Sequence, residues 1–164
     1  MITSTMQDDV PLTTNAITRH TAALHGDVEL AAFDGERVHR TPYAVVLDRA
    51  LRLAGALRAA GVAEGDRVGT FMWNTPAHLE AYFGVPNAGA VLHTINLRLF
   101  PDQIAGIIDH AADRVLIVDA SMWDTVAPIL AQRPSLRLVV VDGDLDLAAA
   151  AGAVDGIPVA GYEE

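Results

Sequence analysis

The chain has 164 residues, 51% of them apolar, with a formal net charge of −10, eleven arginines, no lysine and no cysteine. This length predicts one domain or a piece of a larger protein, and the apolar content is sufficient for a real core. The negative charge without a basic stripe argues against nucleic-acid binding. Without cysteine there is no disulfide framework, thiolate nucleophile or cysteine-bound metal. Without lysine, no chemistry that needs its amine can come from this chain.

The first thirteen residues predict a flexible N-terminus, because they carry two aspartates and no apolar run that would mark a signal peptide. Residues 81–97 are uncharged, but Pro86 and several polar residues interrupt them, so they predict a buried helix and strand instead of a membrane span. No transmembrane segment is therefore expected. Together with the absent cysteine, this indicates a cytoplasmic protein.

The N-terminal part predicts a helix over residues 14–24, followed by a β-hairpin whose strands are 29–33 and 37–41 around an Asp-Gly turn. A second helix is predicted to begin at Pro42, with the preceding threonine as its N-cap. Its apolar residues recur at spacings of three and four, which is typical of one buried helix face. Gly61 is placed to end this helix, because glycine adopts the left-handed conformation most readily.

Further along, four near-continuous apolar runs alternate with helical patterns. The predicted strands are 67–73, 90–95, 114–119 and 136–142, and the predicted helices are 76–88, 100–111 and 122–131. The inner face of the first of these helices is expected to carry Leu79, Tyr82, Phe83 and Pro86. Pro86 should also end or kink that helix.

Strands that do not alternate are usually buried on both faces, which is typical of a parallel sheet covered by helices. Residues 14–142 therefore predict an open, doubly wound, mostly parallel α/β fold, flanked by helices, with the N-terminal helix and short hairpin appended. Residues 143–164 are rich in alanine, glycine and aspartate and predict a linker.

Several local patterns imitate known sites but lack an essential part. Gly84 and Gly89 have the spacing of a phosphate loop, but its lysine is missing and the pattern falls within a predicted helix. Asp142, Asp144 and Asp146 imitate the start of a calcium loop whose glycine and bidentate glutamate are absent. The six histidines and three serines fit no zinc or nucleophile motif. The sequence therefore identifies no catalytic residue, cofactor-binding residue or metal ligand.

Polar side chains gather at the end of one apolar strand. His93 lies within the strand, and Thr94, Asn96 and Arg98 follow it. Because α/β sheets bind ligands at the carboxyl ends of their strands, these four residues predict a cleft or an interface. The alternative for His93 is a hydrogen-bonded structural histidine in an interface or beneath a neighbouring domain.

Five stretches between residues 40 and 119 match motifs of one enzyme superfamily. They are residues 41–47, 57–68, 87–92, 93–101 and 109–116. The first matches the pattern L-(T/S)-Y-x-E-L with valine in place of its glutamate, the second carries a helix, a glycine and G-D-R-V, and the third contains A-G-A. With these stretches the chain resembles the N-terminal region of AMP-forming acyl-CoA synthetases. The fourth and fifth resemble the branch that activates medium- and long-chain fatty acids.

The resemblance implies a two-step reaction of the complete enzyme, which uses ATP, Mg²⁺ and CoA. The fatty acid carboxylate attacks ATP to give an acyl-adenylate and pyrophosphate, and the CoA thiol then displaces AMP. The family performs this with a phosphate loop, a Mg²⁺-holding glutamate, a ribose-binding aspartate and a lysine from a C-terminal lid. This chain has no such loop and no lysine.

Two hypotheses follow. In the first, the chain is the N-terminal segment of a fatty acyl-CoA ligase, inactive alone, which serves as scaffold, cleft wall and, by resemblance, as a homodimer surface. In the second, it is a freestanding, non-catalytic α/β module for binding or dimerisation.

Overall fold

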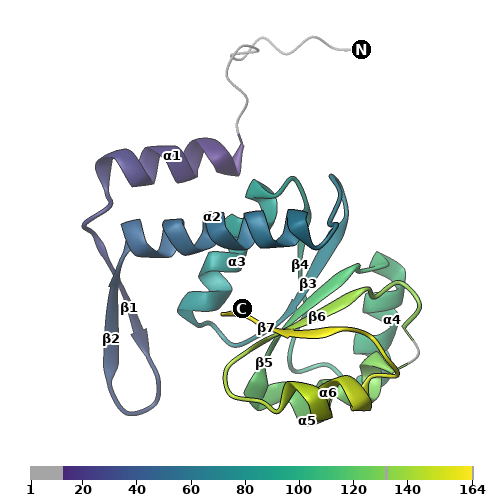
Figure 1. Ribbon diagram of the computed structural model, residues 1–164. Coiled ribbons are helices and arrows are strands. Elements are labelled where there is room, and N and C mark those ends of the chain that lie inside the picture. Colours follow the sequence, from purple (N-terminus) through teal and green to yellow (C-terminus); the bar gives the residue numbers. More distant parts are fainter. Residues whose placement is uncertain (1–12, 132, 164) are drawn as a thin grey trace, which may run out of the picture.

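The computed structural model describes residues 13–131 and 133–163, which form a sheet between two layers of helices, with a helix and a hairpin beside it (Figure 1). The predicted flexible N-terminus lies, apart from Thr13, outside the described residues. The strands of the main sheet are β3 Arg67–Phe71, β4 Val91–Thr94, β5 Val115–Asp119, β6 Leu138–Asp142 and β7 Val159–Gly161. All pairs are parallel, in the order β4-β3-β5-β6-β7. The predicted open parallel sheet is confirmed, with one strand more than expected.

Helices cover both faces of this sheet (Figure 1). The helices on one face are α2 Tyr43–Ala59 and α3 Pro76–Asn87. Those on the other face are α4 Pro101–Ala111, α5 Trp123–Leu130 and α6 Leu147–Ala153, with a short 3₁₀ turn, Ala120–Met122, before α5. Two separate buried clusters result, one around Leu57, Val68, Ala81, Val85 and Ile117, the other around Phe71, Ile104, Ile108, Leu116 and Leu130. The first four residues of β5 are all buried, which explains why its sequence shows no alternation.

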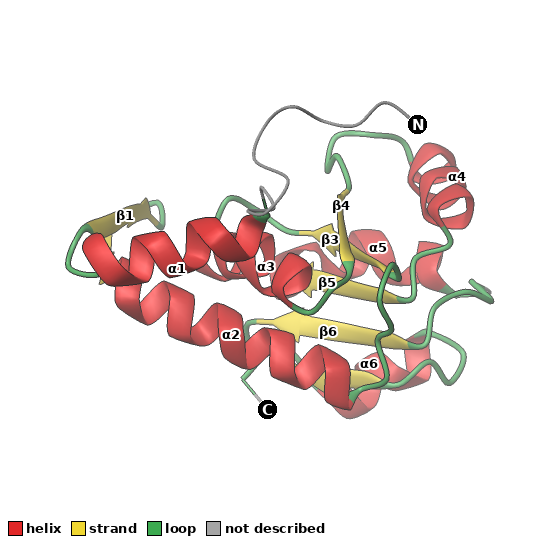
Figure 2. Cartoon of the chain, turned by 90° about the horizontal axis from the view of Figure 1, so that it is seen from above, coloured by secondary structure: helices red, strands yellow, loops and turns green. Residues whose placement is uncertain are grey.

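The N-terminal elements lie beside the sandwich. They are α1 Thr14–Leu24 and the antiparallel hairpin of β1 Glu29–Phe33 and β2 Val38–Pro42, as the sequence predicts within one residue. Figure 2 shows α1 beside α2 and α3, and Asn87 Nδ2 on α3 donates a hydrogen bond to Thr18 Oγ1 on α1 at 3.0 Å. Pro42 is the N-cap of α2 instead of its first residue.

The inner face of α3 differs from the prediction. Tyr82 is 47% exposed, and the buried positions are Ala77, Ala81, Gly84 and Val85 instead. The reason is the close approach of α2: a Cβ on Gly84 would lie 2.8 Å from the carbonyl oxygen of Ala50. Large residues are therefore excluded from this face, which a pattern based on large apolar residues cannot reveal.

The predicted linker over residues 143–164 is wrong, because this segment folds. Asp146 caps α6, with its Oδ1 accepting hydrogen bonds from the backbone N–H groups of Ala148 and Ala149, each at 3.1 Å. Alanine is the best helix former, so its abundance here favours a helix. β7 then pairs with β6 and forms one edge of the sheet. Within the described ranges, no helix is both long and apolar enough to cross a membrane.

Three helix C-termini on the sheet are capped by arginines. At the end of α3, Arg58 donates to the carbonyl oxygens of Asn87 and Ala88. At the end of α4, Arg67 donates to those of Ala111 and Ala112. Arg133 donates to the carbonyl oxygen of Ile129 in the last turn of α5 at 2.9 Å. These carbonyls carry the negative end of each helix dipole, so the guanidinium groups stabilise all three crossovers.

Candidate functional site at the carboxyl edge of the sheet

The order of the strands places a topological switch point between β3 and β5. The chain runs from β3 through α3 to β4 on one side, then returns through α4 on the opposite face to β5 on the other side of β3. The helices that follow β3 and β5 therefore lie on opposite faces, and open α/β sheets bind ligands in the crevice at the carboxyl edge of such a switch point. This topology makes the crevice the first candidate site.

An indole ring bridges this crevice. Trp73, two residues after β3, donates its Nε1–H to Ser121 Oγ after β5, at 3.2 Å. The Ser121 hydroxyl donates in turn to Asp119 Oδ1 at 2.6 Å, and its backbone N–H donates to the same oxygen at 3.0 Å. Trp73 remains 48% exposed. The crevice therefore offers a fixed aromatic surface to solvent.

A buried histidine holds the same loop from inside. His78 Nδ1 lies 3.1 Å from the carbonyl oxygen of Trp73, and its Nε2 lies 3.0 Å from Thr70 Oγ1. A carbonyl only accepts, so the hydrogen-bond network assigns the proton to Nδ1 and makes Nε2 the acceptor from Thr70. Burial lowers the pKa of His78, which keeps the ring neutral. The neutral His78 side chain therefore fixes the backbone at Trp73 relative to β3.

A pocket of about 240 Å³ opens between the loops after β3 and β4. It is lined by Met72, Trp73, Asn74, His78, Ile95, Asn96, Leu97 and Arg98. Asn96 Oδ1 accepts a hydrogen bond from the backbone N–H of Arg98 at 2.9 Å, which turns the loop. The Arg98 side chain is exposed and makes no hydrogen bond or ion pair with any described residue. Its guanidinium is available to an anion.

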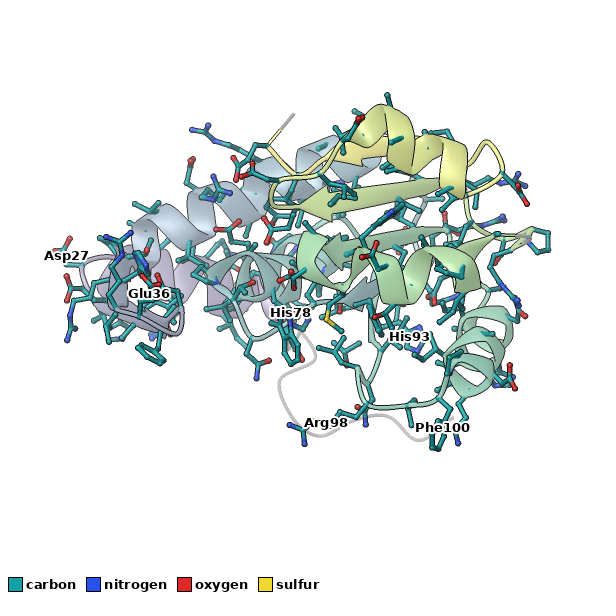
Figure 3. The ribbon with its side chains drawn as sticks, turned by 90° about the horizontal axis from the view of Figure 1, so that it is seen from below. Asp27, Glu36, His78, His93, Arg98 and Phe100 are labelled. Atoms are coloured by element: carbon teal, nitrogen blue, oxygen red, sulfur yellow. The ribbon has the colours of Figure 1, made fainter. Side chains whose placement is uncertain are left out.

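The structure separates the four residues that the sequence grouped together. Asn96 and Arg98 line the pocket, whereas His93 points to Asp113, the last residue but one before β5. Figure 3 shows His93 and Arg98 well apart. Thr94 is the exposed last residue of β4 and lines none of the larger pockets of the described chain. Trp73, Asp119 and Ser121 were not identified from the sequence, although each follows a predicted strand or ends one.

Acidic side chains gather at the far end of the same edge. Asp119 and Asp142 are partners in the register of β5 and β6. Burial, and then the charge of Asp119, raise the pKa of Asp142 to about 6; Glu80 and Glu163 act in the same direction, and Arg49 opposes them. Asp142 therefore keeps its proton to a higher pH than an ordinary aspartate does.

One arginine ties the segment after β7 to two helices. Arg49 on α2 donates from Nε to Oε1 of the buried Glu80 on α3 at 2.7 Å, and from Nη1 to Glu163 Oε2 at 3.0 Å. Tyr162 donates its hydroxyl proton to Glu80 Oε2 at 3.0 Å, and burial raises the pKa of Tyr162. Both oxygens of Glu80 are thus paired, as a buried carboxylate requires.

The other patterns have structural roles. Gly84 packs against α2, and Asp146 caps α6, so neither belongs to a phosphate or calcium loop. The described residues contain no cluster of three His, Asp or Glu side chains able to hold a metal. No donor set among residues 13–131 and 133–163 fits the Mg²⁺ that the resemblance implies.

The fold is a doubly wound α/β unit with a topological switch point between β3 and β5. The chain belongs to the AMP-binding enzyme family, whose profile matches residues 18–157. It is 42% identical over 142 residues to a 3-methylmercaptopropionyl-CoA ligase of Ruegeria pomeroyi, covering 86% of this chain and 26% of that protein. It is 50% identical over 122 residues to a long-chain-fatty-acid–CoA ligase of Thermus thermophilus, covering 73% and 22%.

A solved structure shows the same fold. Coronafacic acid ligase from Pectobacterium brasiliense superposes with a TM-score of 0.80 at 20% identity, over 93% of this chain and 29% of that chain. The chain therefore spans about a quarter of the length of the curated relatives it matches.

Proposed function

We propose that this chain forms the first α/β unit of an AMP-forming fatty acyl-CoA ligase, which converts a fatty acid, ATP and CoA into acyl-CoA, AMP and pyrophosphate. The observation that carries the proposal is the 42% and 50% identity to two acid–CoA ligases over most of the chain. We also propose a cytoplasmic location for this reaction, which the absence of cysteine from the sequence supports.

In this proposal the chain supplies scaffold and cleft wall, and it has no activity alone. Adenylyl transfer needs positive groups and N–H donors preorganised around the phosphates. Removing one such donor typically costs about 10²–10³ in rate. This sequence lacks lysine and the phosphate loop altogether. The purified chain should therefore support no fatty-acid-dependent ATP–pyrophosphate exchange above the buffer blank, and exchange in a preparation free of contaminating ligase would contradict this.

The native mass of the polypeptide in its source cell tests the assignment itself. Peptides or an antibody against residues 40–119 should detect a species several times heavier than 17.4 kDa, whose remaining sequence carries the phosphate loop and the lysine. A species of 17.4 kDa would remove the ligase assignment in favour of a binding module.

Asn96 and Arg98 face a phosphate-bearing substrate in this proposal. An exposed arginine in the same pocket as the half-exposed Trp73 suits a phosphate carried by a planar base, because arginine pairs with phosphate and bases stack on aromatic rings. Titration with CoA, and separately with ATP, should quench Trp73 fluorescence. Arg98→Gln should weaken that binding about tenfold, the effect of one charge-assisted hydrogen bond. Equal affinities in both proteins, or no quenching by either nucleotide, would contradict this role.

The second candidate, a freestanding binding or dimerisation module, is favoured by one observation. Both faces of the sheet are covered, and within the described chain Ser135 Oγ is the only buried side-chain polar atom without a partner. Such packing suits a unit that folds by itself. This module should run as a monodisperse monomer or dimer by analytical ultracentrifugation and unfold cooperatively.

A further inference from the structure

The side chains of His93 and Asp113 meet across strand β3, and we call this pair the staple. Asp113 is fully buried, and His93 Nδ1 lies 3.0 and 2.9 Å from its two carboxylate oxygens. His93 belongs to the edge strand β4, opposite Gly69 of β3, while Asp113 precedes β5 on the other side of β3. The pair therefore links the two strands that flank β3.

Gly69 makes this crossing possible. A Cβ at this position would lie 3.2 Å from Asp113 Oδ2 and 2.6 Å from Leu116 Cδ1. The carboxylate thus occupies the space above β3 that any other residue would fill. Glycine inside a strand weakens it and often marks a close approach of other groups, which is the case here.

The staple lies next to the loop that carries the candidate site. Among the described strands β4 pairs with β3 alone, and its ladder with β3 ends at Thr94. Two residues after His93, Ile95 is buried and donates its N–H to the carbonyl oxygen of Thr70 at 3.0 Å. Asn96 and Arg98 then line the pocket beside Trp73. The direction in which this loop leaves the sheet depends on how β4 is held.

We propose that His93 is a positioning residue for the crevice: by its hydrogen bonds to Asp113 it holds the edge strand β4, and through it keeps Arg98 in the pocket that Trp73 also lines. This inference rests on the proposed function in one respect, namely that the crevice binds substrate. His93 itself does not line the pocket. A buried carboxylate that loses its donor must be protonated or move, and either change releases β4.

Quenching of Trp73 by iodide tests the placement of Arg98 without any substrate. Iodide is an anion that the guanidinium attracts, and neutral acrylamide reports exposure alone. Iodide reaches Trp73, which is 48% exposed, and not Trp123, which is 7% exposed. The quenching constant of iodide divided by that of acrylamide therefore measures whether the Arg98 guanidinium lies near Trp73. The same ratio in Arg98→Gln gives the value expected without the guanidinium.

His93→Phe keeps a ring but removes the N–H that donates to Asp113. Its iodide-to-acrylamide ratio should fall to that of Arg98→Gln. His93→Asn restores a donor to Asp113 and should keep the wild-type ratio. His110→Asn, an exposed histidine of α4, is the matched control and should also be unchanged.

Because His93→Phe leaves a buried carboxylate unpaired, the double variant His93→Phe/Asp113→Leu provides a folded alternative, with both partners removed. A wild-type ratio in either folded variant would overturn the proposal. If iodide behaves as expected and neither CoA nor ATP quenches Trp73, the substrate role of the crevice fails and the positioning role of His93 stands.

Discussion

His93 and Asp113 are 20 residues apart in the chain and on opposite sides of β3, yet their side chains meet at 2.9 Å. Burial raises the pKa of Asp113, and the hydrogen bond from His93 opposes that rise, with a smaller contribution from the charge of Arg67. The space for this contact is the side chain that Gly69 lacks. A side chain at this position would force Leu116 and the Asp113 carboxylate to shift.

Gly69→Ala should therefore destabilise the fold by about 1–3 kcal/mol, the usual cost of overpacking a well-packed interior. The added Cβ would clash with Leu116 Cδ1 at 2.6 Å. Gly55→Ala in α2 is the control, because nothing lies within 4 Å of its Cβ position. In a helix this change should stabilise by up to about 1 kcal/mol. Urea unfolding measures both, and equal midpoints for the two variants would contradict the packing argument.

Tyr162→Phe should destabilise the chain by about 1–3 kcal/mol, because it leaves Oε2 of the buried Glu80 without its donor. Tyr43→Phe is the matched control, since the Tyr43 hydroxyl makes no hydrogen bond with the described residues. Thermal unfolding should separate the two variants clearly. Identical melting temperatures would mean that Tyr162 contributes nothing through its hydroxyl.

The stability of the chain should depend on pH through Asp142. Its folded pKa of about 6 lies above the ordinary 3.8, so the folded state holds this proton more tightly than the unfolded state does. The resulting stabilisation is complete below the unfolded pKa and is lost as the pH rises through about 6. Urea midpoints from pH 4 to pH 7 should fall more steeply for the wild type than for Asp142→Asn. Parallel curves would show that Asp142 titrates normally.

Exposed apolar side chains at the hairpin end should bind the dye ANS. Phe33 and Val38 are register partners at the tip, 69% and 55% exposed. Contiguous apolar surface of this kind marks interaction sites or aggregation liabilities. Replacing both by threonine keeps β propensity and should reduce dye fluorescence and light scattering. Unchanged fluorescence would place the dye elsewhere on the chain.

The hydrophobic pattern correctly predicted strands that are buried on both faces and helices that bury one regular face. The continuous apolar run of β5 is buried as expected. The predicted stripe on α2 is buried too, except for the partly buried Tyr43 at its start; its other members are Leu47, Ala50, Ala54 and Leu57. The inner face of α3 was not predicted because it consists largely of small residues. Strand β7 was not predicted because its three residues are too few to show a hydrophobic pattern.

The contacts of the site could not be predicted from local sequence. Trp73 and Ser121 are 48 residues apart, and they meet only because β3 and β5 are neighbours while β4, which lies between them in sequence, is at the edge. Strand order is a property of how the helices divide between the two faces, and no short motif encodes it. For the same reason the sequence placed His93 with Arg98, which the fold separates.

The ties of Glu80 and Arg49 to Tyr162 and Glu163 have a mechanical consequence. β7 has three residues, so tension applied to the chain beyond Glu163 would easily peel it from β6. The hydrogen bonds of Arg49 to Glu163 and of Glu80 to Tyr162 would instead transmit that force to α2 and α3, which pack against each other. Movement of any segment attached there would be transmitted to the helices on one face of the sheet, and the edge strand would be spared.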